Sequence, residues 1–120
     1  MTRWKPQLQS NTMDNRTPTA RALSMIGICK KAGRLLSGVP LVCDALREGR
    51  VHLVVYASGA AENSVKRVRD KANSYETAIL AVETTPEDLA KSIGKPGAVA
   101  AIGITDAGFA EAIRKIIDGK

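Results

Sequence analysis

The sequence predicts an α/β fold in which helices cover both faces of one sheet. Helix-like and strand-like patterns alternate from residue 19 onward, which is typical of a sheet layered between helices. Residues 51–57 and 78–82 are apolar runs of strand length, as in strands buried on both faces. The chain has 120 residues, of which 44% are hydrophobic, and this is enough for one domain with its own core.

Two helices, joined by a short extended link, are predicted before the first long strand. Apolar residues recur at helical spacing over 22–29 and again over 39–46, which gives each helix one apolar face. Gly33 and Gly49 follow these stretches and are typical C-terminal stops. Residues 34–37 form the link between the helices.

The alternation continues after residues 51–57 to the end of the chain. The next helix has an inner stripe that includes Val65, Val68 and Tyr75, and its outer face is basic. A capping box over 85–88, with proline at the first helical position, predicts another helix start. The elements predicted here are a helix over 61–75, a buried strand over 78–82, a short helix to about Ile93, a last strand over 98–104 and a final helix opened by Asp106.

The domain is predicted to span residues 19–120, behind a flexible N-terminal extension of residues 1–18. The extension has no hydrophobic period and contains Trp4, two prolines and several amides. Met13 is an alternative start of the natural chain. No apolar run approaches the roughly 18 residues of a membrane span, and residues 1–20 lack the apolar segment of a secretion signal. We therefore expect a cytoplasmic protein with no membrane partner.

The positive charge is concentrated in the first part of the chain. The net charge is +6; residues 1–75 hold 13 Lys and Arg against 5 Asp and Glu, whereas residues 76–120 hold 5 against 7. This imbalance indicates a polyanionic partner, nucleic acid before membrane. Composition alone is equally compatible with charge that only keeps the protein in solution.

Residues that could carry catalysis or bind a metal are sparse. Cys29 and Cys43 each fall on the apolar stripe of a helix, so we expect them in the core and not in a disulfide or zinc site. The single histidine, His52, lies near a strand start without a patterned partner and is expected at the strand edge or partly buried. The chain has no phosphate-binding loop motif. We predict no enzyme activity, no cofactor and no metal.

The remaining polar signals favour RNA. Lysine and arginine cluster around the first glycine turn and on the outer face of the helix over 61–75. Ser37-Gly38 and Ser58-Gly59 precede helix starts, where free backbone N–H groups attract anions. With only four aromatic residues in the chain, base stacking on an aromatic platform is not expected. Structured RNA, recognised through its shape and phosphates, fits these features better.

The stretch from Ala22 to Ile117 resembles the ribosomal protein L7Ae/L30e family, in particular its short bacterial ribosome-associated members that are similar to kink-turn binders. Five segments occur in the family's order and at about its spacing. They are Lys30-Lys31-Ala32-Gly33-Arg34-Leu35-Leu36-Ser37-Gly38, Ala45-Leu46-Arg47-Glu48-Gly49, Ala60-Ala61-Glu62-Asn63-Ser64, Leu89-Ala90-Lys91-Ser92-Ile93-Gly94-Lys95 and Ile104-Thr105-Asp106-Ala107-Gly108-Phe109-Ala110.

The resemblance implies a three-layer α/β/α sandwich with a mixed four-stranded sheet and no catalytic activity. It also implies an RNA surface at the turn into the second helix, the start of the third helix and the loop before the last strand. We expect a monomer that binds ribosomal or other structured RNA and contacts ribosomal proteins. Combined with the charge pattern, the predicted RNA contacts are Lys30, Lys31, Arg34, Ser37, Gly38, Asn63, Lys66 and Lys95.

The base-reading residues of the family's kink-turn binders are absent. Those proteins follow the glycine that matches Gly38 with an Asn-Glu pair and then a lysine one turn later. Here these positions hold Pro40, Leu41 and Asp44. Phosphate contacts position a protein on RNA and base contacts specify the site, so we predict RNA binding with weak or absent kink-turn specificity.

Two other function classes stay open at this point. One is a protein-interaction module of a ribonucleoprotein without direct RNA contact, which an exposed apolar patch at residues 39–41 would favour. The other is a small-molecule enzyme, since a fold does not fix a function. A deep pocket around His52 or a cysteine would favour it. Convergence of the predicted cations on one face would favour RNA over both.

Overall fold

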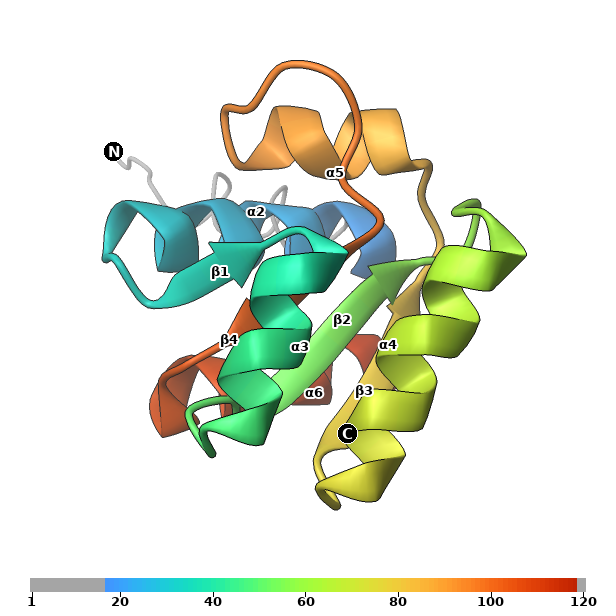
Figure 1. Ribbon diagram of the computed structural model, residues 1–120. Helices are drawn as coiled ribbons and strands as arrows, with labels where there is room; N and C mark the ends of the chain where they lie inside the picture. The colour runs from blue at the N-terminus through green and yellow to red at the C-terminus, as the bar shows by residue number, and fades with distance from the viewer. Residues whose placement is uncertain (1–16, 119–120) are drawn as a thin grey trace, which may run out of the picture.

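The computed structural model describes residues 17–118, so nearly all of the predicted extension lies outside the described residues. Five helices and four strands alternate within this range, in the predicted order (Figure 1). In chain order they are α2 (Pro18–Lys31), β1 (Leu35–Ser37), α3 (Val39–Arg47), β2 (Leu53–Ala57), α4 (Glu62–Ser74), β3 (Ala78–Val82), α5 (Pro86–Ser92), β4 (Ala101–Ile104) and α6 (Ala107–Asp118).

The sheet is mixed and has the strand order β1-β4-β2-β3. Strand β4 runs antiparallel to both β1 and β2, while β2 and β3 are parallel. Helices α3 and α4 cover one face of the sheet, and α2, α5 and α6 cover the other (Figure 1). The predicted three-layer α/β/α sandwich with a mixed four-stranded sheet is confirmed.

Short polar side chains fix where three of the helices begin. Thr17 caps α2 by accepting a hydrogen bond from the Ala20 N–H at 3.1 Å, so this helix starts one residue before the predicted boundary. The Thr85 hydroxyl accepts from the Asp88 N–H at 3.1 Å, which confirms the predicted start of α5. Asp106 accepts from the Phe109 N–H at 2.9 Å. Each bond satisfies an N–H that the helix itself leaves without a partner.

The core consists of two apolar clusters, one on each face of the sheet. Cys29 lies in the cluster beneath α2, α5 and α6, and Cys43 lies in the cluster beneath α3 and α4. Both cysteines are buried and neither forms a disulfide, as predicted. Burial, together with the nearby Asp106 carboxylate, raises the pKa of the Cys29 thiol to about 11. This thiol therefore stays protonated at neutral pH and is a poor nucleophile.

Two burial predictions were wrong. Strand β3 is not buried on both faces: it lies at the sheet edge beside β2 alone, and its Ala78 and Ala81 are exposed. Tyr75 is not part of the inner stripe of α4. It is the C-cap of that helix, beyond its last turn, and is 42% exposed. Among residues 17–118, no helix has both the length and the apolar character that crossing a membrane requires.

Candidate nucleic-acid interface

Three strands end at the same edge of the sheet, which we call the strand-end edge. Strands β1 and β2 both run against β4, and β3 runs parallel to β2, so β1, β2 and β3 end where β4 begins. Backbone hydrogen bonds join the connections there. The Gly38 N–H donates to the Ala101 carbonyl at 2.9 Å, and the Gly59 N–H donates to the Thr84 carbonyl at 3.1 Å. The turns that follow β1, β2 and β3 are thus held near one another.

Helices α3, α4 and α5 all begin at the strand-end edge. The first N–H groups of a helix carry a partial positive charge that attracts anions. In α5 the Thr85 side chain occupies one of these donors. The N-caps of α3 and α4 are Gly38 and Ala61, which provide no side-chain cap. Two helices therefore present uncapped N–H groups at this edge.

Gly38 makes the turn from β1 into α3. Its φ is +99° and its ψ is 138°, a backbone conformation that residues with a Cβ rarely adopt. A Cβ built at this position would have no neighbour within 4 Å, so the conformation and not the available space requires glycine here. The surface over this turn is open to an approaching ligand.

The predicted RNA contacts separate into two groups instead of forming one face. Gly38 and the exposed Asn63, in the first turn of α4, lie at the strand-end edge. Lys30, Lys31 and Arg34 lie at the other end of β1, where the Thr105 N–H donates to the Arg34 carbonyl. Lys95 follows the end of α5, away from the start of that helix. The helices that carry Lys30 and Lys66, α2 and α4, cover opposite faces of the sheet.

Two of the predicted contacts are compromised by their own surroundings. Ser37 is only 8% exposed, which leaves its side chain almost no surface for a ligand. Lys66 is exposed, but its ammonium group lies 2.8 Å from the Asp70 carboxylate one helical turn later. Sequence spacing could have indicated this pair, since residues i and i+4 are neighbours on a helix.

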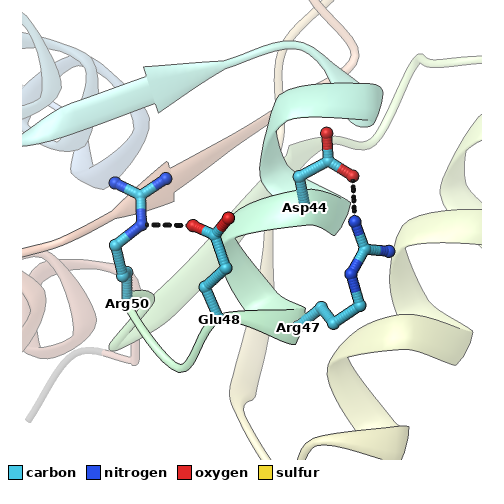
Figure 2. A network of polar contacts seen from close by, with 4 residues as sticks. All are labelled: Asp44, Arg47, Glu48 and Arg50. Carbon is cyan, nitrogen blue, oxygen red and sulfur yellow. Dashed lines mark hydrogen bonds and ion pairs between the residues drawn. The ribbon is translucent and has the colours of Figure 1, made fainter.

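Three arginines, in or just after α3 and in α4, also have local partners. Arg47 forms an ion pair with Asp44 at 2.8 Å, and Arg50 forms one with Glu48 at 2.8 Å (Figure 2). Asp44, which stands where a kink-turn binder has a lysine, is therefore partly neutralised within α3. Arg69 lies over the ring of Tyr56 at 5.7 Å and donates to its hydroxyl at 3.3 Å. These contacts reduce the cations available to a ligand on the α3 and α4 face.

A basic region away from the strand-end edge lies between α2 and α5. Lys30 and Lys31 line a groove of about 620 Å³ together with Lys91 from the last turn of α5. We call it the lysine groove. Lys91 was missed by the sequence prediction, because its proximity to α2 depends on how the two helices pack and no local pattern indicates it.

The chemistry around His52 is limited. The side chain is exposed just before β2, and it lines a small open depression of about 250 Å³ with Glu111 and Arg114. Of the two predicted environments, the strand edge and partial burial, the second is not observed. Neither cysteine lines this depression. Among residues 17–118, no group of three or more His, Cys, Asp or Glu side chains is placed to hold a metal ion.

Residues 39–41 form a partly exposed apolar surface at the start of α3. Val39 is buried, Pro40 is exposed and Leu41 is 53% exposed. Leu41 therefore leaves an apolar side chain in solvent beside the uncapped start of α3. One exposed side chain is common in proteins, but its position at the strand-end edge gives it access to any partner bound there.

The fold and this edge define a small α/β/α binding domain whose ligand-facing elements are turns and helix starts. The chain belongs to the Ribosomal protein L7Ae/L30e/S12e/Gadd45 family, whose family model matches residues 20–114. The resemblance seen in the sequence is thereby confirmed.

Known proteins support the same grouping. The chain is 34% identical to RNA-binding protein YlxQ of Enterococcus faecium over 99 aligned residues. The aligned region covers 82% of this chain and 93% of that protein. A solved structure of a Bacillus halodurans protein of unknown function is 34% identical and has a TM-score of 0.76, covering 82% of this chain and 98% of that one. The Giardia lamblia 15.5kD RNA binding protein shares the fold, with a TM-score of 0.70, 11% identity and 88% coverage of both chains.

Proposed function

We propose that this protein binds structured RNA through the phosphate backbone at the strand-end edge. The observation that carries the proposal is the placement of two uncapped helix starts, those of α3 and α4, at the same end of the sheet. Backbone N–H groups at helix starts are common phosphate ligands in protein–nucleic acid complexes. The relative from Enterococcus faecium is called an RNA-binding protein, which supports this assignment.

In this proposal the RNA is recognised mainly by shape. Gly38 lets a sugar–phosphate backbone approach the start of α3 closely. Asn63 provides an exposed amide in the first turn of α4. Pro40 and Leu41 offer no side-chain hydrogen bond to a base edge, and Asp44 is engaged by Arg47. We therefore propose weak or absent preference for kink-turns.

The proposal places the protein in the cytoplasm as a monomer associated with ribosomal RNA or another ribonucleoprotein. It assigns the chain no catalytic step and no cofactor. The helix starts can hold a phosphate without help from a metal ion, since their N–H groups already carry partial positive charge.

Binding to a kink-turn and to a plain RNA duplex of equal length, measured across a salt series, tests this function. We expect similar affinities for both RNAs, each falling as the salt concentration rises because phosphate contacts release counterions. A tight preference for the kink-turn that salt does not weaken would overturn the shape-based mechanism. Absence of binding to either RNA at low salt would overturn the function itself.

The exposure of Leu41 favours a second candidate function, a protein-interaction module of a ribonucleoprotein without direct RNA contact. Crosslinking in cells, followed by sequencing of the attached RNA, separates the two. Enrichment of one ribosomal RNA site supports RNA binding. Absence of any enriched RNA supports the protein-interaction module.

A further inference from the structure

We propose that the lysine groove between α2 and α5 docks a segment of a partner protein that contains both acidic and apolar side chains. This inference goes beyond the proposed RNA function, because the groove lies away from the strand-end edge. Helix α5 begins at that edge, and the groove is lined by its last residues. A partner in the groove and an RNA at the edge would therefore occupy different surfaces.

The groove is held in shape by close packing of the two helices. A Cβ built on Gly27 of α2 would lie 2.8 Å from the Ser92 carbonyl oxygen of α5. Real Cβ atoms do not approach that closely, so glycine allows α5 to sit directly against α2 at this level. The groove is thus a consequence of helix packing and does not depend on a loop.

Three ammonium groups line the groove without a carboxylate to neutralise them. Lys30 and Lys31 come from the last turn of α2, and Lys91 comes from the last turn of α5. All three are exposed, and none forms an ion pair within residues 17–118. No Asp or Glu is among the lining residues. By contrast, Lys66 and Arg47 on the other face of the molecule each have a carboxylate partner.

The groove lining also includes large apolar side chains. Leu23, Ile28 and Ile93 contribute to it. Ile28 is 53% exposed, the same fraction as Leu41, and these two are the most exposed large hydrophobic side chains within residues 17–118. Lysines near a helix C-terminus also interact favourably with the helix dipole. That effect accounts for the cations but not for an isoleucine left in solvent in the same groove.

The combination favours a protein segment over a nucleic acid. A sugar–phosphate backbone gains from ammonium groups but gains nothing from an exposed Ile28, and no aromatic side chain lines the groove for stacking a base. A segment with alternating carboxylates and aliphatic side chains satisfies both features. The carboxylates pair with the lysines, and the aliphatic groups cover the apolar lining.

Fluorescence anisotropy with the full chain tests the inference. The probe is a labelled amphipathic peptide built from Leu, Glu and Ala, and the control peptide has each Leu replaced by Ser at the same charge. We expect the Leu peptide to bind and the Ser peptide to bind about tenfold more weakly or worse, a difference of about 1.4 kcal/mol. Equal binding of the two peptides would overturn the inference, because it would reduce the groove to a nonspecific positive surface.

Two matched double variants locate the binding. Lys30→Glu with Lys91→Glu reverses two groove charges, each in the last turn of its helix. Arg67→Glu with Lys71→Glu reverses two charges on α4, neither of which forms an ion pair within residues 17–118. We expect about a tenfold or greater loss of peptide affinity for the first pair and less than about a twofold change for the second. Equal losses of peptide affinity in the two double variants would contradict binding in the lysine groove.

A third variant, Ile28→Ser, and a measurement of RNA binding by the groove double variant complete the test. Ile28→Ser keeps the charge and should weaken the Leu peptide at least about threefold while leaving the Ser peptide unchanged. The Lys30→Glu, Lys91→Glu variant should still bind duplex RNA within about threefold of the original chain. If this double variant loses affinity for both the RNA and the peptide, the groove is a nucleic-acid surface and this inference is wrong. If the original chain binds peptide but no RNA, the inference holds and the proposed function fails.

Discussion

The strand-end edge and the lysine groove attract negative charge in different ways. At the edge the attraction comes from backbone N–H groups of α3 and α4, and the nearest lysine on α4 is paired with Asp70. In the groove it comes from three ammonium groups without an ion-pair partner in residues 17–118, in a lining that also contains large apolar side chains. Backbone dipoles suit a phosphate that comes close to a glycine turn, whereas lysines beside an isoleucine suit a carboxylate with aliphatic neighbours. The two regions therefore fit different partners.

This difference also shows why net charge was a poor guide to location. The basic half of the sequence contributes both α2 and α4, and these helices cover opposite faces of the sheet. At the end of α3, carboxylates neighbouring in sequence neutralise part of the charge (Figure 2). On α4, Asp70 does the same for Lys66. The cations without an ion-pair partner in the described part of the chain include Lys30 and Lys31 at the end of α2. They line the same groove as Lys91, which comes from the less basic part of the sequence.

The largest effect is expected for Gly27→Ala, which should deform the groove and spare the edge. The new methyl group would lie 2.8 Å from the Ser92 carbonyl oxygen, so α5 must move or the backbone must distort. Thermal or urea unfolding should show a loss of about 1–3 kcal/mol, even though alanine favours the helix more than glycine does. An unchanged stability would mean that α5 shifts freely and that the groove is not a fixed feature.

A smaller effect is expected for Asn63→Asp, which adds a negative charge at the start of α4. RNA affinity should fall about threefold to tenfold, since the charge repels a phosphate bound at the edge. Stability should be unchanged or higher by about 0.3–1 kcal/mol, because an acid near a helix N-terminus is favourable. Filter binding and thermal unfolding of the same preparations measure both effects.

Asn73→Asp is the matched control for that change, since it makes the same substitution in the last turn of α4. We expect RNA affinity within about twofold of the original and a slight loss of stability, because the charge now lies at the negative end of the helix. If both variants lose RNA affinity equally, repulsion is general and the RNA is not bound at the start of α4.

The smallest effect is expected for Asp70→Asn, which releases Lys66. Both side chains are mostly exposed, so the ion pair contributes at most about 0.5 kcal/mol to stability. Freed from its partner, Lys66 should strengthen RNA binding by about twofold to threefold and steepen the salt dependence slightly. A weaker affinity would show that the Lys66–Asp70 pair positions the lysine for RNA instead of competing with it.

The order of helices and strands was predictable, because hydrophobic period, glycine stops and caps are local signals. The start of α5 followed from the capping box at Thr85, and both cysteines were placed correctly in the core. The edge position of β3 was not predictable in this way. Its apolar run over 78–82 has the composition of a buried strand, and only the pairing order reveals that it has a single neighbour.

The candidate site was less predictable than the fold, because it depends on which segments meet in space. The turn at Gly38 and the helix start at Asn63 were identified, and the structure places both at the strand-end edge. Lys30 and Lys66 were grouped although their helices cover opposite faces of the sheet, since one sequence cannot show which face each helix covers. Lys91 was missed because its proximity to α2 depends on how α2 and α5 pack against each other. The burial of Ser37 follows from its place in β1, which pairs with β4 and is packed between α2 and α3.

Backbone amide chemical shifts, measured by NMR on the full chain during an RNA titration, test the central claim most directly. Binding at the strand-end edge predicts that the largest shifts fall at Gly38 and the first turn of α3, and at residues 59–65 leading into α4. Shifts confined to the lysine groove, at residues 27–31 and 91–94, would contradict the account, because the ligand would then be held by lysine side chains and not by uncapped helix starts.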